Sequence, residues 1–140
     1  WQDRVSVLSA AASNKYGTAS LHVPGSNQGS ASIMRTFGDD YPSFAVEVPT
    51  IPLDSRLDDD FDFIKFDIEG AEPLAMEGMV GILSNNPLIA IEVVGTQTDF
   101  INYLFDFYDV TEIGTNGDEM VVTRADIHKK VWAMLVLRSK

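Results

Sequence analysis

The sequence contains no cysteine, which excludes disulfide bonds and thiolate metal sites. Basic residues are also scarce: 10 Lys and Arg stand against 21 Asp and Glu, and the formal net charge is -11. Because so acidic a surface repels phosphate groups and anionic lipid, we expect neither nucleic acid nor a membrane surface as a partner. No apolar run approaches the roughly 18 residues of a membrane span, and no basic-then-apolar signal segment opens the chain. This composition fits a cytoplasmic protein.

The sequence contains enough apolar residues to form a hydrophobic core. Its 140 residues are 45% hydrophobic, which is typical of one globular domain rather than of a disordered chain. No internal repeat and no Pro- or charge-rich linker divides it. We therefore expect one domain over residues 1–140. The first residue is Trp1 rather than Met, so we expect the chain to enter this domain part-way through.

The first half of the chain predicts short strands separated by polar turns. Apolar and polar residues alternate loosely there, which is the pattern of half-buried strands. Pro49 and Pro52 demote the third strand to a sheet edge or a strand exit, because proline cannot donate to a ladder of hydrogen bonds. The expected elements are a strand at 4–13, a turn at 14–17, a strand at 18–23, a small-residue loop at 24–32, a strand at 44–54 and a short polar helix or loop at 55–62.

The middle of the chain predicts a strand, a helix and a second strand. Residues 63–68 and 88–95 are short apolar runs of strand length, and residues 73–83 carry apolar side chains at helical spacing. Such a βαβ unit requires parallel strands and a right-handed crossover. Gly78 and Gly81 each weaken the helix by up to about 1 kcal/mol relative to alanine, so close packing is the expected reason for them.

The last third predicts one helix and three strands. Thr96 and Thr98 can each cap a helix whose apolar face runs from Phe100 to Tyr108. An Asn116-Gly117 pair between two apolar stretches indicates a hairpin. Residues 131–138 form a buried strand that closes the chain. The tail is therefore expected to be antiparallel, at the edge of a parallel sheet.

Carboxylates gather where the predicted strands end. The stretch FDFIKFDIEGAEPLAMEG (61–78) places Asp67, Glu69 and Glu72 where a strand leads into a helix, and Glu92 lies near the carboxyl end of the next strand. Ligands of open α/β sheets bind at this end of the strands. Asp67 and Glu69 would project to the same side if the backbone stays extended. Such a rim could grip a hydroxyl or amine, accept its proton, or hold a divalent ion.

Structural explanations for these acids remain open. Glu69 and Glu72 could simply favour the positive end of a helix, and Lys65 could pair with any of the acids. A salt bridge could also satisfy Glu92, which would be costly to bury alone. A cation-assisted hydrolase is a further alternative, and it predicts tight binding of Mg²⁺, Mn²⁺ or Ca²⁺. The two histidines are distant from the acids in sequence, and we expect both at the surface.

Two stretches, IKFDIEGAEPLAMEG and NPLIAIEVVG, resemble the signature of FkbM-type methyltransferases. That signature reads I-K-x-D-x-E-G-x-E, followed by a helix and by a Pro-led strand that ends in Glu. The upstream segments VLSAAASNKYGTASLHV, GSNQGSAS and VEVPTIPLD are also similar to the family. The resemblance implies a Rossmann-like class I α/β sheet, mostly parallel with antiparallel C-terminal strands. It also implies S-adenosylmethionine as cofactor and methyl transfer to oxygen on a sugar or other small-molecule acceptor.

The resemblance assigns roles to individual acids. Asp67 and Glu69 match the acidic pair after the fourth strand of that fold, where methyl donor and acceptor meet. Either could orient or deprotonate the acceptor. Glu72 and Glu92 match two further acids of the pattern, which would hold the geometry of the site or a cation. Methyl transfer depends more on in-line positioning than on strong acid–base help, so these roles are mainly orientation. Whether a metal takes part is left open.

The sequence departs from the family at its beginning. The glycine-rich cofactor turn and the acid that binds ribose would precede Trp1, so the chain resembles an N-terminally truncated domain. The stretch GSNQGS does not replace that turn, because it lacks the G-x-G-x-x-G spacing after a core strand. Ala12 and Ser13 match a region near the adenine of the cofactor, and they are the candidate cofactor-binding residues of this chain.

The truncation leads to two expectations. The absent strands would lie between residues 4–13 and 63–68, so free sheet edges should favour self-association or a rearranged N-terminal half. Cofactor binding by the chain should be weak or absent. The alternative function is then a non-catalytic fold remnant or interaction domain that lacks a complete donor site.

Overall fold

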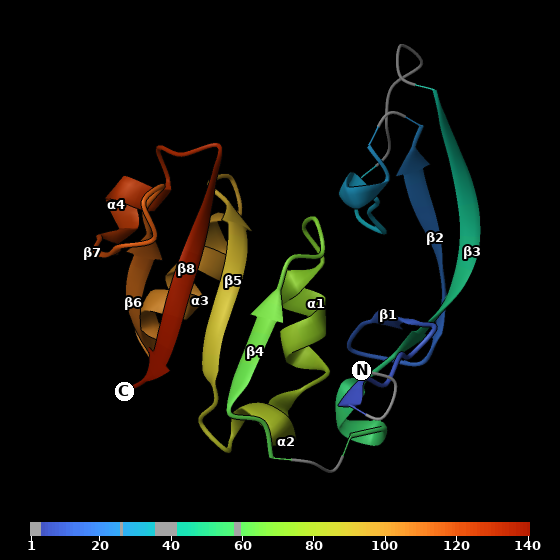
Figure 1. The fold of residues 1–140 in the computed structure, drawn as a ribbon, viewed down its shortest axis with the longest axis horizontal. Coiled ribbons are helices and arrows are strands. Elements are labelled where there is room, and N and C mark those ends of the chain that lie inside the picture. The colour runs from blue at the N-terminus through green and yellow to red at the C-terminus, as the bar shows by residue number, and fades with distance from the viewer. Residues whose placement is uncertain (1–3, 26, 36–41, 58–59) are drawn as a thin grey trace.

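The computed structural model describes residues 4–25, 27–35, 42–57 and 60–140, and in these residues it forms two separate sheets. Figure 1 shows the larger sheet on one side of helix α1 and the smaller sheet on the other. The strand orders are β1-β3-β2 and β4-β5-β8-β6-β7. The strands are β1 (Ala11–Ala12), β2 (Gly17–Pro24), β3 (Ser43–Ile51), β4 (Phe63–Phe66), β5 (Leu88–Val94), β6 (Tyr108–Ile113), β7 (Glu119–Val121) and β8 (Trp132–Ser139).

In the described part of the chain, four α-helices and two 3-10 helices have defined bounds. None of the described helices is both long and apolar enough to cross a membrane. The α-helices are α1 (Glu72–Glu77), α2 (Val80–Leu83), α3 (Thr98–Phe107) and α4 (Arg124–Ile127), and the 3-10 helices are η2 (Gln28–Ser30) and η3 (Leu53–Ser55).

The predicted βαβ unit is confirmed in its strands and altered in its helix. Strands β4 and β5 pair in parallel, with Phe63 opposite Leu88 and Phe66 opposite Ile91. The helix expected over 73–83 is two short helices, because the backbone leaves helical geometry at Met79. A side chain at Gly78 would place its Cβ 2.0 Å from the carbonyl oxygen of Ser13. The close packing expected at this glycine is therefore present.

The C-terminal strand does not lie at the sheet edge as expected. β8 is antiparallel to both of its neighbours and lies between β5 and β6, while β7 is the terminal strand. Burial explains this position: Leu135 and Leu137 are 0% exposed, whereas Met120 and Val121 of β7 are largely exposed. The predicted hairpin is confirmed, with Gly117 in the left-handed region at φ 84°.

The capping prediction for α3 is wrong. Gln97 occupies the N-cap, Thr98 is the first helical residue, and Tyr108 already belongs to β6. Ile101 and Leu104 of this helix are 0% exposed and contact the main core. Complete burial of an aliphatic side chain contributes about 1.5–3 kcal/mol. The helix is thus held by its apolar face rather than by a threonine cap.

The prediction of a long strand at 4–13 is also wrong. Only Ala11 and Ala12 pair, in parallel with Thr50 and Ile51. The reason is that Val5 and Val7 are 62% and 81% exposed, so the alternation has no buried face to fix a strand.

β3 lies at the centre of its sheet, contrary to the edge position that its prolines indicated. It pairs with β2 from Ser43 to Thr50 but with β1 only at its last two residues, so no described strand lies beside Pro49 on its second side. The strand then ends before Pro52, as expected.

The mixed α/β class is confirmed, but the described strands are not mostly parallel. The parallel pairs are β1–β3 and β4–β5, and the remaining pairs of named strands are antiparallel.

Replacing Gly78 with alanine tests the contact between the two halves of the chain. We expect Gly78→Ala to lower the free energy of unfolding by about 1–3 kcal/mol, because the new Cβ would overlap a backbone carbonyl that cannot rotate away. Gly17→Ala is the matched control, since the nearest atom to its Cβ would be Thr50 Oγ1 at an ordinary 3.4 Å. Equal urea denaturation midpoints for the two variants would contradict the packing explanation.

Candidate active site

The turn between β4 and α1 has an unusual backbone. Glu69 and Gly70 both lie in the left-handed region, with φ 57° and 100°. Glycine adopts this region freely, whereas a residue with a side chain does so at a cost. The backbone is therefore not extended beyond Asp67. The prediction that Asp67 and Glu69 project to the same side required an extended backbone, so that condition is not met. The turn itself now determines where Glu69 points.

The structure nevertheless brings three of the predicted acids together. Asp67, Glu69 and Glu92 each offer a carboxylate oxygen, and these oxygens lie within 4.8 Å of one another. The parallel register explains the approach of the two strands, because Phe66 lies opposite Ile91 and the next residue of each strand is an acid. We call Asp67, Glu69 and Glu92 the acid cluster.

Two basic side chains contact the acid cluster. Lys65 Nζ lies 2.6 Å from Asp67 Oδ2, and Arg35 forms an ion pair with Glu69. The sequence left open whether Lys65 pairs with one of the acids, and in the structure it pairs with Asp67. Its two side chains are about half exposed, so solvent screening limits its contribution to about 1 kcal/mol or less. Nothing in the sequence indicated Arg35, because ion pairs between distant segments leave no local pattern.

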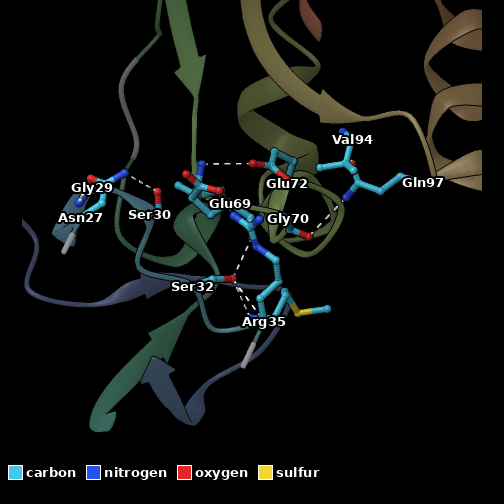
Figure 2. Close-up of polar contacts among 12 residues, drawn as sticks. Asn27, Gly29, Ser30, Ser32, Arg35, Glu69, Gly70, Glu72, Val94 and Gln97 are labelled. Atoms are coloured by element: carbon cyan, nitrogen blue, oxygen red, sulfur yellow. Dashed lines mark hydrogen bonds and ion pairs between the residues drawn. The ribbon is translucent and has the colours of Figure 1, made fainter. Parts of the chain in front are cut away.

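Glu72 is adjacent to the cluster but buried. It is only 1% exposed, and its Oε1 accepts a hydrogen bond of 3.0 Å from the backbone N–H of Ile68. Among the described residues, no group hydrogen-bonds to its Oε2. Glu72 is the first residue of α1, which agrees with the expectation that an acid favours a helix N-terminus. Figure 2 shows this side chain reaching back to the turn on which Glu69 lies.

The turn is held by polar side chains from both sides (Figure 2). Ser32 Oγ donates to the carbonyl oxygen of Glu69 at 2.7 Å and accepts from the N–H of Arg35 at 3.1 Å. From the other side, Gln97 Nε2 donates to the carbonyl oxygen of Gly70 at 3.4 Å. Ser32 is 1% exposed, so its hydroxyl is a buried link between the N-terminal half and the turn. Neither side chain was identified from the sequence.

The electrostatic environment raises the pKa of Glu92 above its usual value. Burial is the largest cause, since it penalises the charged form. The charge of Asp67, a hydrogen bond shared with Asp67 and the charge of Glu72 raise the pKa further, whereas Arg35 lowers it. Glu92 thus retains a proton to a higher pH than an ordinary glutamate does.

A cavity of about 610 Å³ adjoins the acid cluster through Asp67. Its wall is mostly small and apolar, and it comes from the smaller sheet and from the turn before α1: Ala11 and Ala12 belong to β1, and Ile68 and Ala71 belong to the turn. Ala12, one of the two predicted cofactor-binding residues, lines this cavity, and its role in cofactor binding stays a prediction. Ser13 is not part of the wall; it is 5% exposed, and its N–H donates to the carbonyl oxygen of Ile51 at 2.9 Å.

None of the described contacts joins either histidine to the acid cluster. Both are half-buried rather than at the surface as expected. The backbone of His22 exchanges hydrogen bonds with Ser32, and His128 Nδ1 lies 3.3 Å from the carbonyl oxygen of Gly95.

Comparison with known protein families decides the relationship that the signature suggested. The family model described as the methyltransferase FkbM domain matches residues 2–117. The chain belongs to the FkbM methyltransferase family. The FkbM match includes the cavity wall, the turn and the whole acid cluster, and it ends in the hairpin before α4 and β8. Comparisons with curated proteins and with solved structures give no significant match.

Removing the charge of Asp67 tests the electrostatics of the acid cluster. We expect Asp67→Asn to lower the pKa of Glu92, because a negative charge that raises this pKa is lost while the burial of Glu92 stays. The measurement is a ¹³C NMR titration of the Glu92 carboxyl, with Glu47→Gln on the exposed face of β3 as the charge-matched control. An unchanged Glu92 titration in Asp67→Asn would refute the coupling.

Proposed function

We propose that this chain catalyses methyl transfer from S-adenosylmethionine to a hydroxyl group of a small molecule or sugar. Membership of the FkbM family supports methyl transfer in general. The observation that carries the finer assignment is the position of Asp67, which belongs both to the cavity wall and to the acid cluster. A single carboxylate at that boundary can meet donor and acceptor together.

The cavity suits the methyl donor in size and in chemistry. Its volume of about 610 Å³ lies within the roughly 300–1,000 Å³ of small-molecule sites. Small side chains such as Ala11, Ala12 and Ala71 leave room for a flat ring against the wall. The carboxylate of Asp67 would balance the positive sulfonium. When bound, the donor supplies an electrophilic methyl group.

On the acceptor side, Asp67 is the better of the two proposed orienting acids. Both acids are paired with a basic side chain, but Glu69 is not part of the cavity wall, whereas Asp67 is exposed and lines the cavity. Its carboxylate would accept a hydrogen bond from the acceptor hydroxyl and take the proton as the new O–CH₃ bond forms and the S–CH₃ bond breaks. Correct in-line placement would contribute more to the rate than this proton transfer.

A non-catalytic fold core is the second candidate, and the geometry of the small-residue loop favours it. In η2 the Asn27 side chain accepts from the N–H of Gly29 at 3.2 Å and donates to Ser30 Oγ at 2.7 Å. These polar groups hydrogen-bond to one another. The loop therefore gives no substitute for a glycine-rich cofactor turn.

We also propose that the chain self-associates through a sheet edge. β4 is the terminal strand of its sheet, and Phe63 in it is 54% exposed. An uncovered edge of this type favours pairing with another chain. We expect sedimentation equilibrium to show a concentration-dependent dimer, because the free backbone groups of β4 would then be paired. A monomer at all concentrations up to the millimolar range would refute this proposal.

Titration of S-adenosylhomocysteine tests the donor site without turnover. The sequence predicted weak or absent cofactor binding, but the cavity leads us to expect that the wild-type chain binds S-adenosylhomocysteine. Ala12→Leu should weaken binding at least about tenfold, equivalent to about 1.4 kcal/mol, because the larger side chain fills the cavity. The matched control is Ala45→Leu, at an exposed position of β3, which should bind as the wild type does. Thermal melts establish that each variant is folded. A folded wild-type chain that does not bind S-adenosylhomocysteine would exclude the donor site. The non-catalytic fold core would then be the better description of this chain.

A further inference from the structure

The charges around the acid cluster do not balance. Among the described residues, four carboxylates meet two basic groups, which leaves a formal charge of -2 when all are ionised. The residues are Asp67, Glu69, Glu72 and Glu92 against Lys65 and Arg35. Clustering like charges at a half-buried rim is unfavourable unless a further cation compensates them.

The oxygen atoms have the spacing of ligands around a hard cation. Oxygens on opposite sides of Mg²⁺ are about 4.2 Å apart, given ion–oxygen distances of about 2.1 Å, and those around Ca²⁺ are about 4.6–5.2 Å apart. The three carboxylate oxygens of the cluster all lie within 4.8 Å of one another. One ion could therefore contact all three with little movement of the backbone.

Glu72 provides an independent indication of a missing ligand. This residue is 1% exposed, and its Oε2 has no hydrogen-bond partner within the described part of the chain. A buried, unpartnered carboxylate oxygen costs several kcal/mol in general, so such an atom is normally satisfied. The other oxygen of Glu72 binds the N–H of Ile68, between the two turn acids, and its charge acts on Glu92. The free oxygen thus belongs to the same electrostatic centre.

We propose that Asp67, Glu69 and Glu92 bind one hard divalent cation such as Mg²⁺, Mn²⁺ or Ca²⁺. Glu72 Oε2 accepts a hydrogen bond from a water on that ion and so acts as a positioning residue. All the proposed ligands are carboxylates, which these hard cations prefer, and no thiolate or imidazole is needed. The ion neutralises the remaining charge of -2.

The ion also gives the cavity a chemical role, and this part rests on the proposed methyl transfer. A cation held by Asp67 lies at the cavity boundary, where it would bind the acceptor oxygen and lower the pKa of its hydroxyl. The acceptor would then be a compound with a hydroxyl next to a second oxygen, since two oxygens can chelate one ion. The metal site itself does not depend on that reaction.

Calorimetric titration of Mn²⁺ into the 140-residue chain, without any methyl donor, tests the site. We expect binding of one equivalent, weakened at least about tenfold in Glu92→Gln and about 10- to 100-fold in Glu72→Gln, the range found when groups behind metal ligands are changed. Glu47→Gln, which removes one exposed acid elsewhere, should bind as the wild type does. Mn²⁺ electron paramagnetic resonance provides a second readout that does not depend on heat, and thermal melts confirm the folding of each variant.

Three results would overturn the proposal. The first is a folded wild-type chain that binds no Mn²⁺ at millimolar concentration. The second is equal affinity in the wild type and Glu92→Gln, which would mean that ions bind diffusely to an acidic surface. The third is binding that appears only in Arg35→Gln, which would mean that the Arg35 guanidinium is the cation of this cluster. Because no donor is present, failure here is distinct from failure of the proposed methyl transfer.

Discussion

The parallel pairing of β4 with β5 is the constraint on which the candidate site depends. It places the residue after Phe66 beside the residue after Ile91, and both following residues are acids. A slip of one residue would turn Glu92 to the opposite face of the sheet and separate the carboxylates. The register is secured by burial, because Phe66, Ile89 and Ile91 belong to the main core. The apolar interior therefore determines where the polar chemistry can occur.

A second requirement is that the turn after β4 keeps its left-handed backbone. Glu69 adopts a conformation that side chains rarely take, and hydrogen bonds from Ser32 and Gln97 hold the carbonyl groups of Glu69 and Gly70. These bonds come from two different parts of the chain. Backbone strain of this kind persists where the surroundings define it from several sides, and it is found at functional sites.

Close contacts join segments next to the smaller sheet to the helices of the βαβ unit. The carbonyl of Ser13 packs on Gly78, and the carboxylate of Asp54 accepts from the N–H groups of Gly81 and Ile82 at 2.7 and 2.9 Å. Asp54 thereby takes the place of a cap for α2, which has no side-chain cap of its own. Close packing therefore accounts for both glycines, as predicted. A backbone carbonyl packs against Gly78, and a carboxylate packs against Gly81.

The sequence by itself determined the elements whose signal is local. Apolar runs and helical spacing predicted β4, α1 and β5, the Asn116-Gly117 pair predicted the hairpin, and the acids at strand ends predicted the cluster. Only the tertiary structure decided that Arg35 pairs with Glu69, that Glu72 is buried with a free oxygen, and that β8 lies inside the sheet. It also reduced the expected strand at 4–13 to two residues. The physical reason is the same in each case: hydrophobic period and turn chemistry act between near neighbours, whereas ion pairs, burial and strand order depend on segments that meet only after the chain has folded.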